Sequence, residues 1–141
     1  MLCAKLSGMA AKSKHLSTTI DLPSSAVYEY AADPANLPRW AGGLASTTIE
    51  QVEGQWVADS PMGRVTVSFV AQNDFGVLDH VVTLPSGESV YNPLRVIPYG
   101  DASEVVFTLR QRPGMSDDEF TRDAESIRTD LESLKRALEA G

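Results

Sequence analysis

Several kinds of residue are scarce in this chain of 141 residues, and each scarcity excludes a class of protein. The single cysteine, Cys3, cannot form a disulfide within the chain. Two histidines without further cysteines offer no spacing typical of a zinc site. We therefore expect no metal site, no cofactor and a location in the reducing cytoplasm.

Positive charge and long apolar runs are scarce as well. The chain has 12 Lys and Arg against 19 Asp and Glu, a net charge of −7, so it repels phosphate backbones and we expect no nucleic-acid partner. No apolar run approaches the roughly twenty residues of a membrane span, and Lys5 interrupts the apolar start needed for a signal peptide. We expect no membrane insertion. The composition predicts a flexible N-terminal lead over residues 1–13 and one domain over residues 14–141.

The longest periodic segment lies at the end of the chain and predicts a helix over residues 116–138. Apolar residues recur at intervals of three and four, which places them on one helical face: Phe120, Ala124, Ile127, Leu131, Leu134 and Leu138. Ser116 with Glu119 three residues later is typical of a capping box. A coiled coil is the alternative, but the apolar seam is shorter than three heptads. Asp130, beside the seam, is expected on a solvated face.

The rest of the chain predicts strands and two short helices. Alternation over residues 15–22 predicts the first strand, and Pro23 ends it. Two short helices follow, divided at Asp33-Pro34 and ended by Gly42-Gly43. Six further runs, separated by turn residues, predict strands over residues 46–52, 55–60, 64–71, 77–84, 88–97 and 104–112.

Together these elements predict an α+β fold. Short links favour a seven-stranded, curved antiparallel sheet wrapped around the long C-terminal helix, with the two short helices between strands one and two. One face of the sheet is apolar, and the long helix is the element able to cover it. A curled sheet does not pack flush along a helix, so we expect an internal cavity.

Three segments resemble a known superfamily: TTIDLPSSAVYEYAADPANLPRWAGGL, NDFGVLDHVVTLPSGE and YNPLRVIPYGDASEVVFTLRQRPGMSDDEF. With the order of elements, they are similar to the START-like (SRPBCC, helix-grip) superfamily, and within it to small bacterial polyketide cyclase/dehydrase-like proteins. The similarity covers about residues 14–139. It implies a helix-grip fold whose cavity binds a small hydrophobic or aromatic ligand. Because the superfamily includes both aromatase/cyclases and lipid carriers, two functions stay open: a cyclase or dehydratase, and a non-catalytic carrier or sensor of a lipid or hydrophobic metabolite. Members often form dimers, so a homodimer is also open.

His80 is the first candidate for chemistry. It alternates with apolar neighbours, so Leu78, His80 and Val82 share one face of their predicted strand. If that face is internal, the imidazole can move a proton in an aldol closure or dehydration. A core histidine bonded to a backbone carbonyl or a tyrosine is the alternative. Asp79 projects to the opposite face, so we do not expect it to form an acid/base pair with His80.

Arg95 and Tyr91 are the second candidates. They lie four residues apart on one predicted strand and so share a face, where they could bind a carboxylate or polarise a ketone oxygen. We predict that they act with His80 as catalytic residues. Pro93 disturbs the alternation, which leaves an exterior Arg95 and Tyr91 open. Asn92 is then the polar group that faces inward.

Large apolar residues complete the predicted ligand contacts. Trp40 lies in the second short helix, at the expected mouth of the cavity. Trp56 lies on a strand, and Met62 lies in the next turn. Each could grip a planar ligand or belong to the core. Three further contacts are expected from the inner faces of the strands and helix: Leu78, Phe107 and Ile127.

Overall fold

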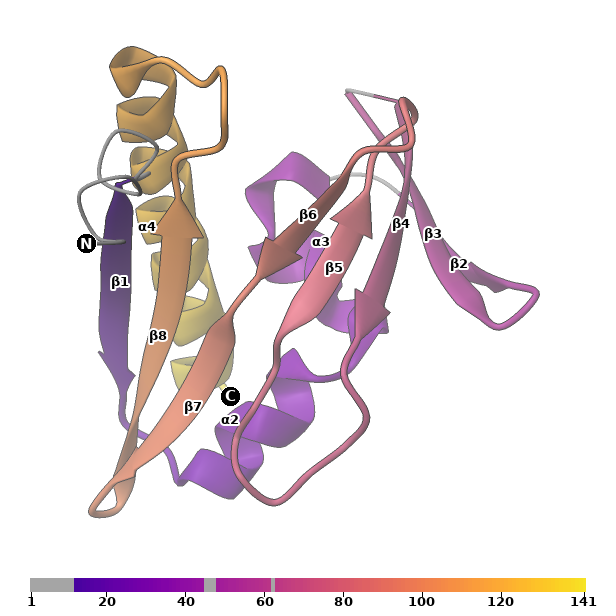
Figure 1. Cartoon of the computed structure of the whole chain (residues 1–141). Coiled ribbons are helices and arrows are strands. Elements are labelled where there is room, and N and C mark those ends of the chain that lie inside the picture. The colour runs from indigo at the N-terminus through magenta and orange to yellow at the C-terminus, as the bar shows by residue number, and fades with distance from the viewer. Residues whose placement is uncertain (1–11, 45–47, 62) are drawn as a thin grey trace, which may run out of the picture.

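The computed structural model describes residues 12–44, 48–61 and 63–141. Residues 1–11 of the predicted N-terminal lead and Met62 lie outside the described residues. The elements, in chain order, are β1 (Ser13–Ile20), α2 (Ser24–Ala31), α3 (Leu37–Trp40), β2 (Ile49–Val52), β3 (Gln55–Ser60), β4 (Gly63–Phe69), β5 (His80–Thr83), β6 (Ser89–Asn92), β7 (Leu94–Tyr99), β8 (Ala102–Arg110) and α4 (Asp117–Glu139) (Figure 1). Short 3-10 turns, η1 (Pro34–Asn36) and η2 (Gly42–Leu44), flank α3.

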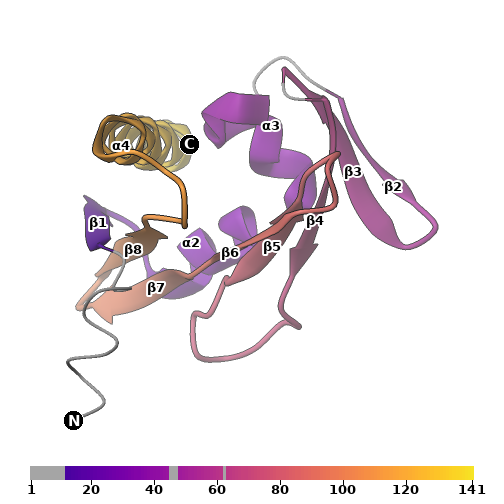
Figure 2. The same cartoon turned by 45° about the horizontal axis from the view of Figure 1, so that its top comes forward.

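The strands form two antiparallel sheets that meet along one curved surface. Their orders are β1-β8-β7 and β2-β3-β4-β5-β6. Residues before β5 join them, since Leu78 N donates to Leu94 O and Val96 N donates to Gly76 O. Figure 2 shows α4 and α3 on the concave side of this surface. The predicted fold is confirmed: a curved antiparallel sheet, a long C-terminal helix and two short helices between the first two strands.

The predicted single strand over residues 88–97 is wrong in one respect. It divides at Pro93 into β6, which pairs with β5, and β7, which pairs with β8. Proline has no N–H to donate to a ladder, so the strand bends there and changes partners. The described residues therefore contain eight strands where the sequence predicted seven.

Helix α4 is built as its sequence indicates. Ser116 Oγ accepts from Glu119 N while Glu119 Oε1 accepts from Ser116 N, so the capping box is confirmed. The apolar seam buries Phe120, Ala124 and Leu134. It packs most extensively on β1, then on α3, and it also contacts β8. The helix thus covers one half of the concave surface, and the short helices lie toward the other half (Figure 2).

The hydrophobic core lies between α4 and the β1-β8-β7 sheet. Ile20, Leu94, Val105 and Leu134 are fully buried there. Within the described parts of the chain, no helix combines the length and apolar character that a membrane crossing requires.

Candidate functional site

The concave face of β4, β5 and β6 holds the predicted site residues that the structure brings together. In the register of these strands, Phe69 pairs with His80 and His80 pairs with Asn92, so the three side chains share a face. His80 is buried, whereas Phe69 and Asn92 are half-buried. Asn92, rather than Tyr91, is therefore the polar residue beside His80.

A cleft of about 320 Å³ lies at the rim of this face, between the end of α2 and the β3–β4 hairpin. It is lined by Ala32, Pro34, Gly54, Gln55, Trp56, Val67, Ser68 and Phe69. Trp56 pairs with Val67, which puts the indole on the concave face. The cleft opens to solvent, whereas the sequence predicted an internal cavity. The reason is that α4 packs on β1 and β8 and leaves this part of the sheet to the short helices.

The His80 ring is held by its neighbours in one orientation. Its Nδ1 lies 3.0 Å from Leu78 O, as in the backbone-bonded alternative considered from the sequence. The ring centroid is 4.9 Å from that of Phe69 and 6.5 Å from that of Phe107. Burial lowers the pKa of His80, although the hydrogen bond to Leu78 and the charge of Asp79 oppose this effect. The imidazole is therefore neutral near pH 7.

Arg95 and Tyr91 lie on the opposite face, where both bind Asp79. Arg95 Nε and Nη2 donate to the two Asp79 carboxylate oxygens over 2.9 and 2.8 Å, and Tyr91 Oη donates to Asp79 Oδ2. Leu94 N donates to Asp79 Oδ1 over 2.9 Å. The predicted convergence of His80 with Arg95 and Tyr91 is wrong, because Asp79 precedes His80 on the chain and draws both side chains to the outer face.

The charges in this cluster stabilise one another. The Arg95 guanidinium holds the pKa of Asp79 well below its usual range, in spite of the burial of the carboxylate. The hydrogen bond to Asp79 raises the pKa of both Tyr91 and Arg95. Strand alternation placed Asp79 on the face opposite His80, but its bonds to Arg95 and Tyr91 were not predicted because they depend on pairing between separate strands.

The remaining predicted contact residues lie in or beside the core. Leu78 and Phe107 are buried, and Ile127 is half-buried against the core. Trp40 is buried, its Nε1 has no hydrogen-bond partner within the described residues, and it does not line the cleft. Trp56 does line the cleft.

Asp130 was also misjudged from the sequence, which placed it on a solvated face of α4. Its Oδ1 accepts from Gly42 N over 2.9 Å, so it joins α4 to η2. Desolvation raises the pKa of Asp130 to about 6, although the hydrogen bond to Gly42 opposes this. Neither the helical periodicity nor the charge pattern signals this contact, which joins residues 88 positions apart.

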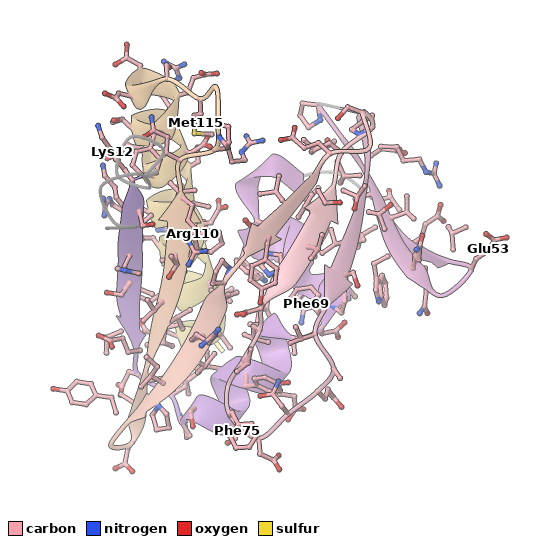
Figure 3. All side chains as sticks on the ribbon, viewed as in Figure 1. Lys12, Glu53, Phe69, Phe75, Arg110 and Met115 are labelled. Carbon is pink, nitrogen blue, oxygen red and sulfur yellow. The ribbon has the colours of Figure 1, made fainter. Side chains whose placement is uncertain are left out.

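A second, wider cleft of about 920 Å³ lies between α2 and the loop that precedes β5. Phe75, at 84% exposure, stands at the tip of that loop (Figure 3). The side chains that line this second cleft include the acidic Glu29 and Asp74. None of the predicted site residues lines it, and carboxylates are poor contacts for an apolar ligand. The cleft at Trp56 is the stronger candidate.

Comparison with known proteins agrees with the fold. A family model described as polyketide cyclase/dehydrase and lipid transport matches residues 13–139. No curated protein matches the chain in sequence.

Solved structures resemble the chain across most of its length. A START superfamily protein from Mycobacterium smegmatis superposes with a TM-score of 0.64 at 12% identity, covering 93% of this chain and 99% of that one. The Zhui aromatase/cyclase from Streptomyces sp. R1128 superposes with a TM-score of 0.65 at 15% identity, covering 92% of this chain and 94% of that one. A conserved protein from Geobacillus kaustophilus superposes with a TM-score of 0.73 at 11% identity, covering 92% of this chain and 96% of that one. At these identities the likeness concerns the fold.

Proposed function

Because this chain belongs to the polyketide cyclase/dehydrase and lipid transport family, we propose that it binds a small hydrophobic or aromatic molecule on the concave face of its sheet. The observation that carries the proposal is the cleft at the rim of that face, with the side chains of Trp56, Val67 and Phe69 in its wall. Aromatic and aliphatic side chains suit a small apolar ligand, and Gln55 and Ser68 add polar groups to the same wall.

Binding without chemical change is the function that the geometry supports best. The predicted cyclase reaction would need a positive charge or an acidic hydroxyl beside the substrate oxygen as well as a base. Arg95 and Tyr91, predicted for that role, instead bind Asp79 on the outer face. A carrier or sensor of a lipid or hydrophobic metabolite needs only the cleft. The proposal includes a cytoplasmic location, in line with the lone Cys3, and the homodimer remains open within it.

A cyclase or dehydratase is the second candidate, and His80 favours it. The ring is buried at 8% exposure, and burial lowers its pKa, so it is unprotonated and able to accept a proton. Under this alternative His80→Ala would abolish turnover while costing no more affinity than the roughly tenfold of one neutral hydrogen bond. A carrier would show no turnover of the ligand in either protein.

The ligand itself is to be identified by native mass spectrometry of the freshly purified protein. The cleft is tested with N-phenyl-1-naphthylamine, an apolar probe that fluoresces when it leaves water. Ala32 lines the cleft, so Ala32→Phe should fill it and weaken probe binding by about tenfold or more. Ala26→Phe, on an exposed position of α2, which ends one residue before Ala32, is the matched control and should bind as the wild type does.

Equal affinities of Ala32→Phe, Ala26→Phe and the wild type would show that the cleft is not the site. If the probe does not bind and no small molecule copurifies, the binding function itself is overturned.

A further inference from the structure

His80 presents a free hydrogen-bond acceptor to the concave face. A carbonyl oxygen can only accept, so the contact between His80 Nδ1 and Leu78 O, at 3.0 Å, requires that Nδ1 carry the hydrogen. In a neutral imidazole the other nitrogen, Nε2, then holds a lone pair and no hydrogen. Nε2 makes no hydrogen bond to any described residue. Burial lowers the pKa of His80, which opposes the doubly protonated form that could donate from Nε2.

Asn92 supplies a donor next to this acceptor. It lies directly opposite His80 in the β5–β6 register, where side chains project to the same face with Cβ atoms about 5 Å apart. The residue is half-buried, and its side-chain amide makes no hydrogen bond to a described residue. An amide both donates and accepts. His80 and Asn92 thus form a polar pair on one face, and within the described residues neither His80 Nε2 nor the Asn92 amide has a hydrogen-bond partner.

The surroundings of this polar pair are apolar and aromatic. The rings of Phe69 and Phe107 lie beside His80, at centroid distances of 4.9 and 6.5 Å. Val82 and Val90, the next residues on this face of β5 and β6, pair with each other. Phe69 also lines the cleft, whereas His80 and Asn92 do not, so the polar pair lies behind the Phe69 ring on the same face of the sheet. Unpaired polar groups in such surroundings are normally satisfied by water or a ligand.

We infer that His80 and Asn92 recognise a hydroxyl group on the ligand, which is therefore a phenol or another hydroxylated apolar molecule. The hydroxyl hydrogen is donated to His80 Nε2, and the hydroxyl oxygen accepts from the Asn92 amide. Carboxylates, ketones and ethers have no hydrogen to donate, so they would leave Nε2 unpaired at a cost in affinity. This inference rests on the proposed binding function and names the ligand class for it.

The test uses two probes that differ by the hydroxyl hydrogen, 2-naphthol and 2-methoxynaphthalene, with affinities measured by isothermal titration calorimetry. We expect the wild type to bind 2-naphthol about 3- to 10-fold more tightly, the range of one neutral hydrogen bond. His80→Phe should remove the preference. His15→Phe is the matched control, because His15 is exposed and bonded to Thr108 on β8, and it should keep the preference.

Long-range ¹H–¹⁵N spectra of the imidazoles test the same inference without a substitution. We expect a neutral His80 protonated at Nδ1, with an Nε2 resonance that shifts when 2-naphthol is added. Protonation at Nε2 in the free protein would overturn the inference. Equal affinities of the two probes for the wild type would overturn it too and leave the binding function standing. If neither probe binds although N-phenyl-1-naphthylamine does, the inference is overturned and the binding function stands; if none of the three binds and no small molecule copurifies, both are overturned.

Discussion

Asp79 is the residue on which the junction of the two sheets depends. Its carboxylate is 4% exposed and accepts from Arg95, Tyr91 and the backbone of Leu94, so it ties the start of β5 to β6 and β7 where the chain bends at Pro93. A buried carboxylate is tolerated only when its oxygens are paired. The polar residues that looked catalytic in the sequence therefore have a clear structural role.

Replacing Asp79 by Ala should lower the free energy of unfolding by about 2–3 kcal/mol, because it leaves the Leu94 N–H and the Arg95 guanidinium without their acceptor. Urea denaturation measures the effect. Asp59→Ala is the control, since the Asp59 carboxylate is 78% exposed and its pair with Arg64 is 3.9 Å long; we expect it to cost less than about 0.5 kcal/mol. Similar losses in the two variants would contradict the role given to Asp79.

The loss should also depend on pH. The pKa of Asp79 is lowered in the folded protein from its ordinary value of 3.8, so its contribution is present above that value and is lost as the pH falls below it. The difference in unfolding free energy between wild type and Asp79→Ala should therefore narrow between pH 5 and pH 3. A difference that stays constant over this range would count against the ion pair as its source.

At the scale of elements, the contact between η2 and α4 connects the short helices to the long one. Gly42 N donates to Asp130 Oδ1, and a Cβ on Gly42 would stand 2.9 Å from that oxygen. Glycine is therefore the residue that lets the backbone approach the carboxylate without displacing it. Because α3 leads directly into η2, this contact fixes the position of α3 against α4.

The elevated pKa of Asp130 makes this connection sensitive to pH. Its pKa is about 6 in the folded protein against an ordinary 3.8, so its contribution to stability is full below 3.8 and is lost as the pH rises through about 6. Asp130→Asn keeps an oxygen acceptor without the charge. The melting temperature of Asp130→Asn minus that of the wild type should therefore be several degrees larger at pH 8 than at pH 4.

Thermal unfolding at both pH values measures this change, and Asp74→Asn is the control. Asp74 is exposed and makes no side-chain hydrogen bond to a described residue. The melting temperature of Asp74→Asn should therefore differ from that of the wild type by nearly the same amount at pH 4 and pH 8. The pH-sensitive role of Asp130 would be refuted if both variants responded alike.

At the scale of the whole molecule, the two sheets are buried to different extents. Leu94 on β7 and Val105 on β8 are fully inaccessible, and α4 lies over β1 and β8. In contrast, β2 has three exposed residues out of four and lies at the edge of the other sheet (Figure 1). The cleft at Trp56 lies in the more open half, since its strand residues come from β3 and β4.

Local unfolding should follow this difference. Elements with few buried contacts open more readily than the core, so amide hydrogens of β2 should exchange at least about 100-fold faster than those of β8. Hydrogen–deuterium exchange with mass spectrometry measures both strands in one experiment, and β1, which pairs with β8 along its whole length, serves as an internal reference. Equal protection of β2 and β8 would show that the sheet unfolds as one unit.

The sequence by itself determined the elements, because their signals are local. The apolar seam and capping box predicted a helix over residues 116–138, and the structure has α4 at Asp117–Glu139. Alternation and turn residues located the strands in the same way. Short links and the apolar face of the strands predicted their arrangement around the helix, and the resemblance to the START-like superfamily agreed with it.

Only the tertiary structure decided which polar side chains meet. Strand register and the bend at Pro93 put Asn92 beside His80 and turned Tyr91 and Arg95 toward Asp79. A shift of one residue moves every side chain of a strand to the other face, and this phase is set by pairing between distant segments. For the same reason the open cleft and the Asp130 contact, which depend on how α4 lies across the sheet, could not be derived from local patterns.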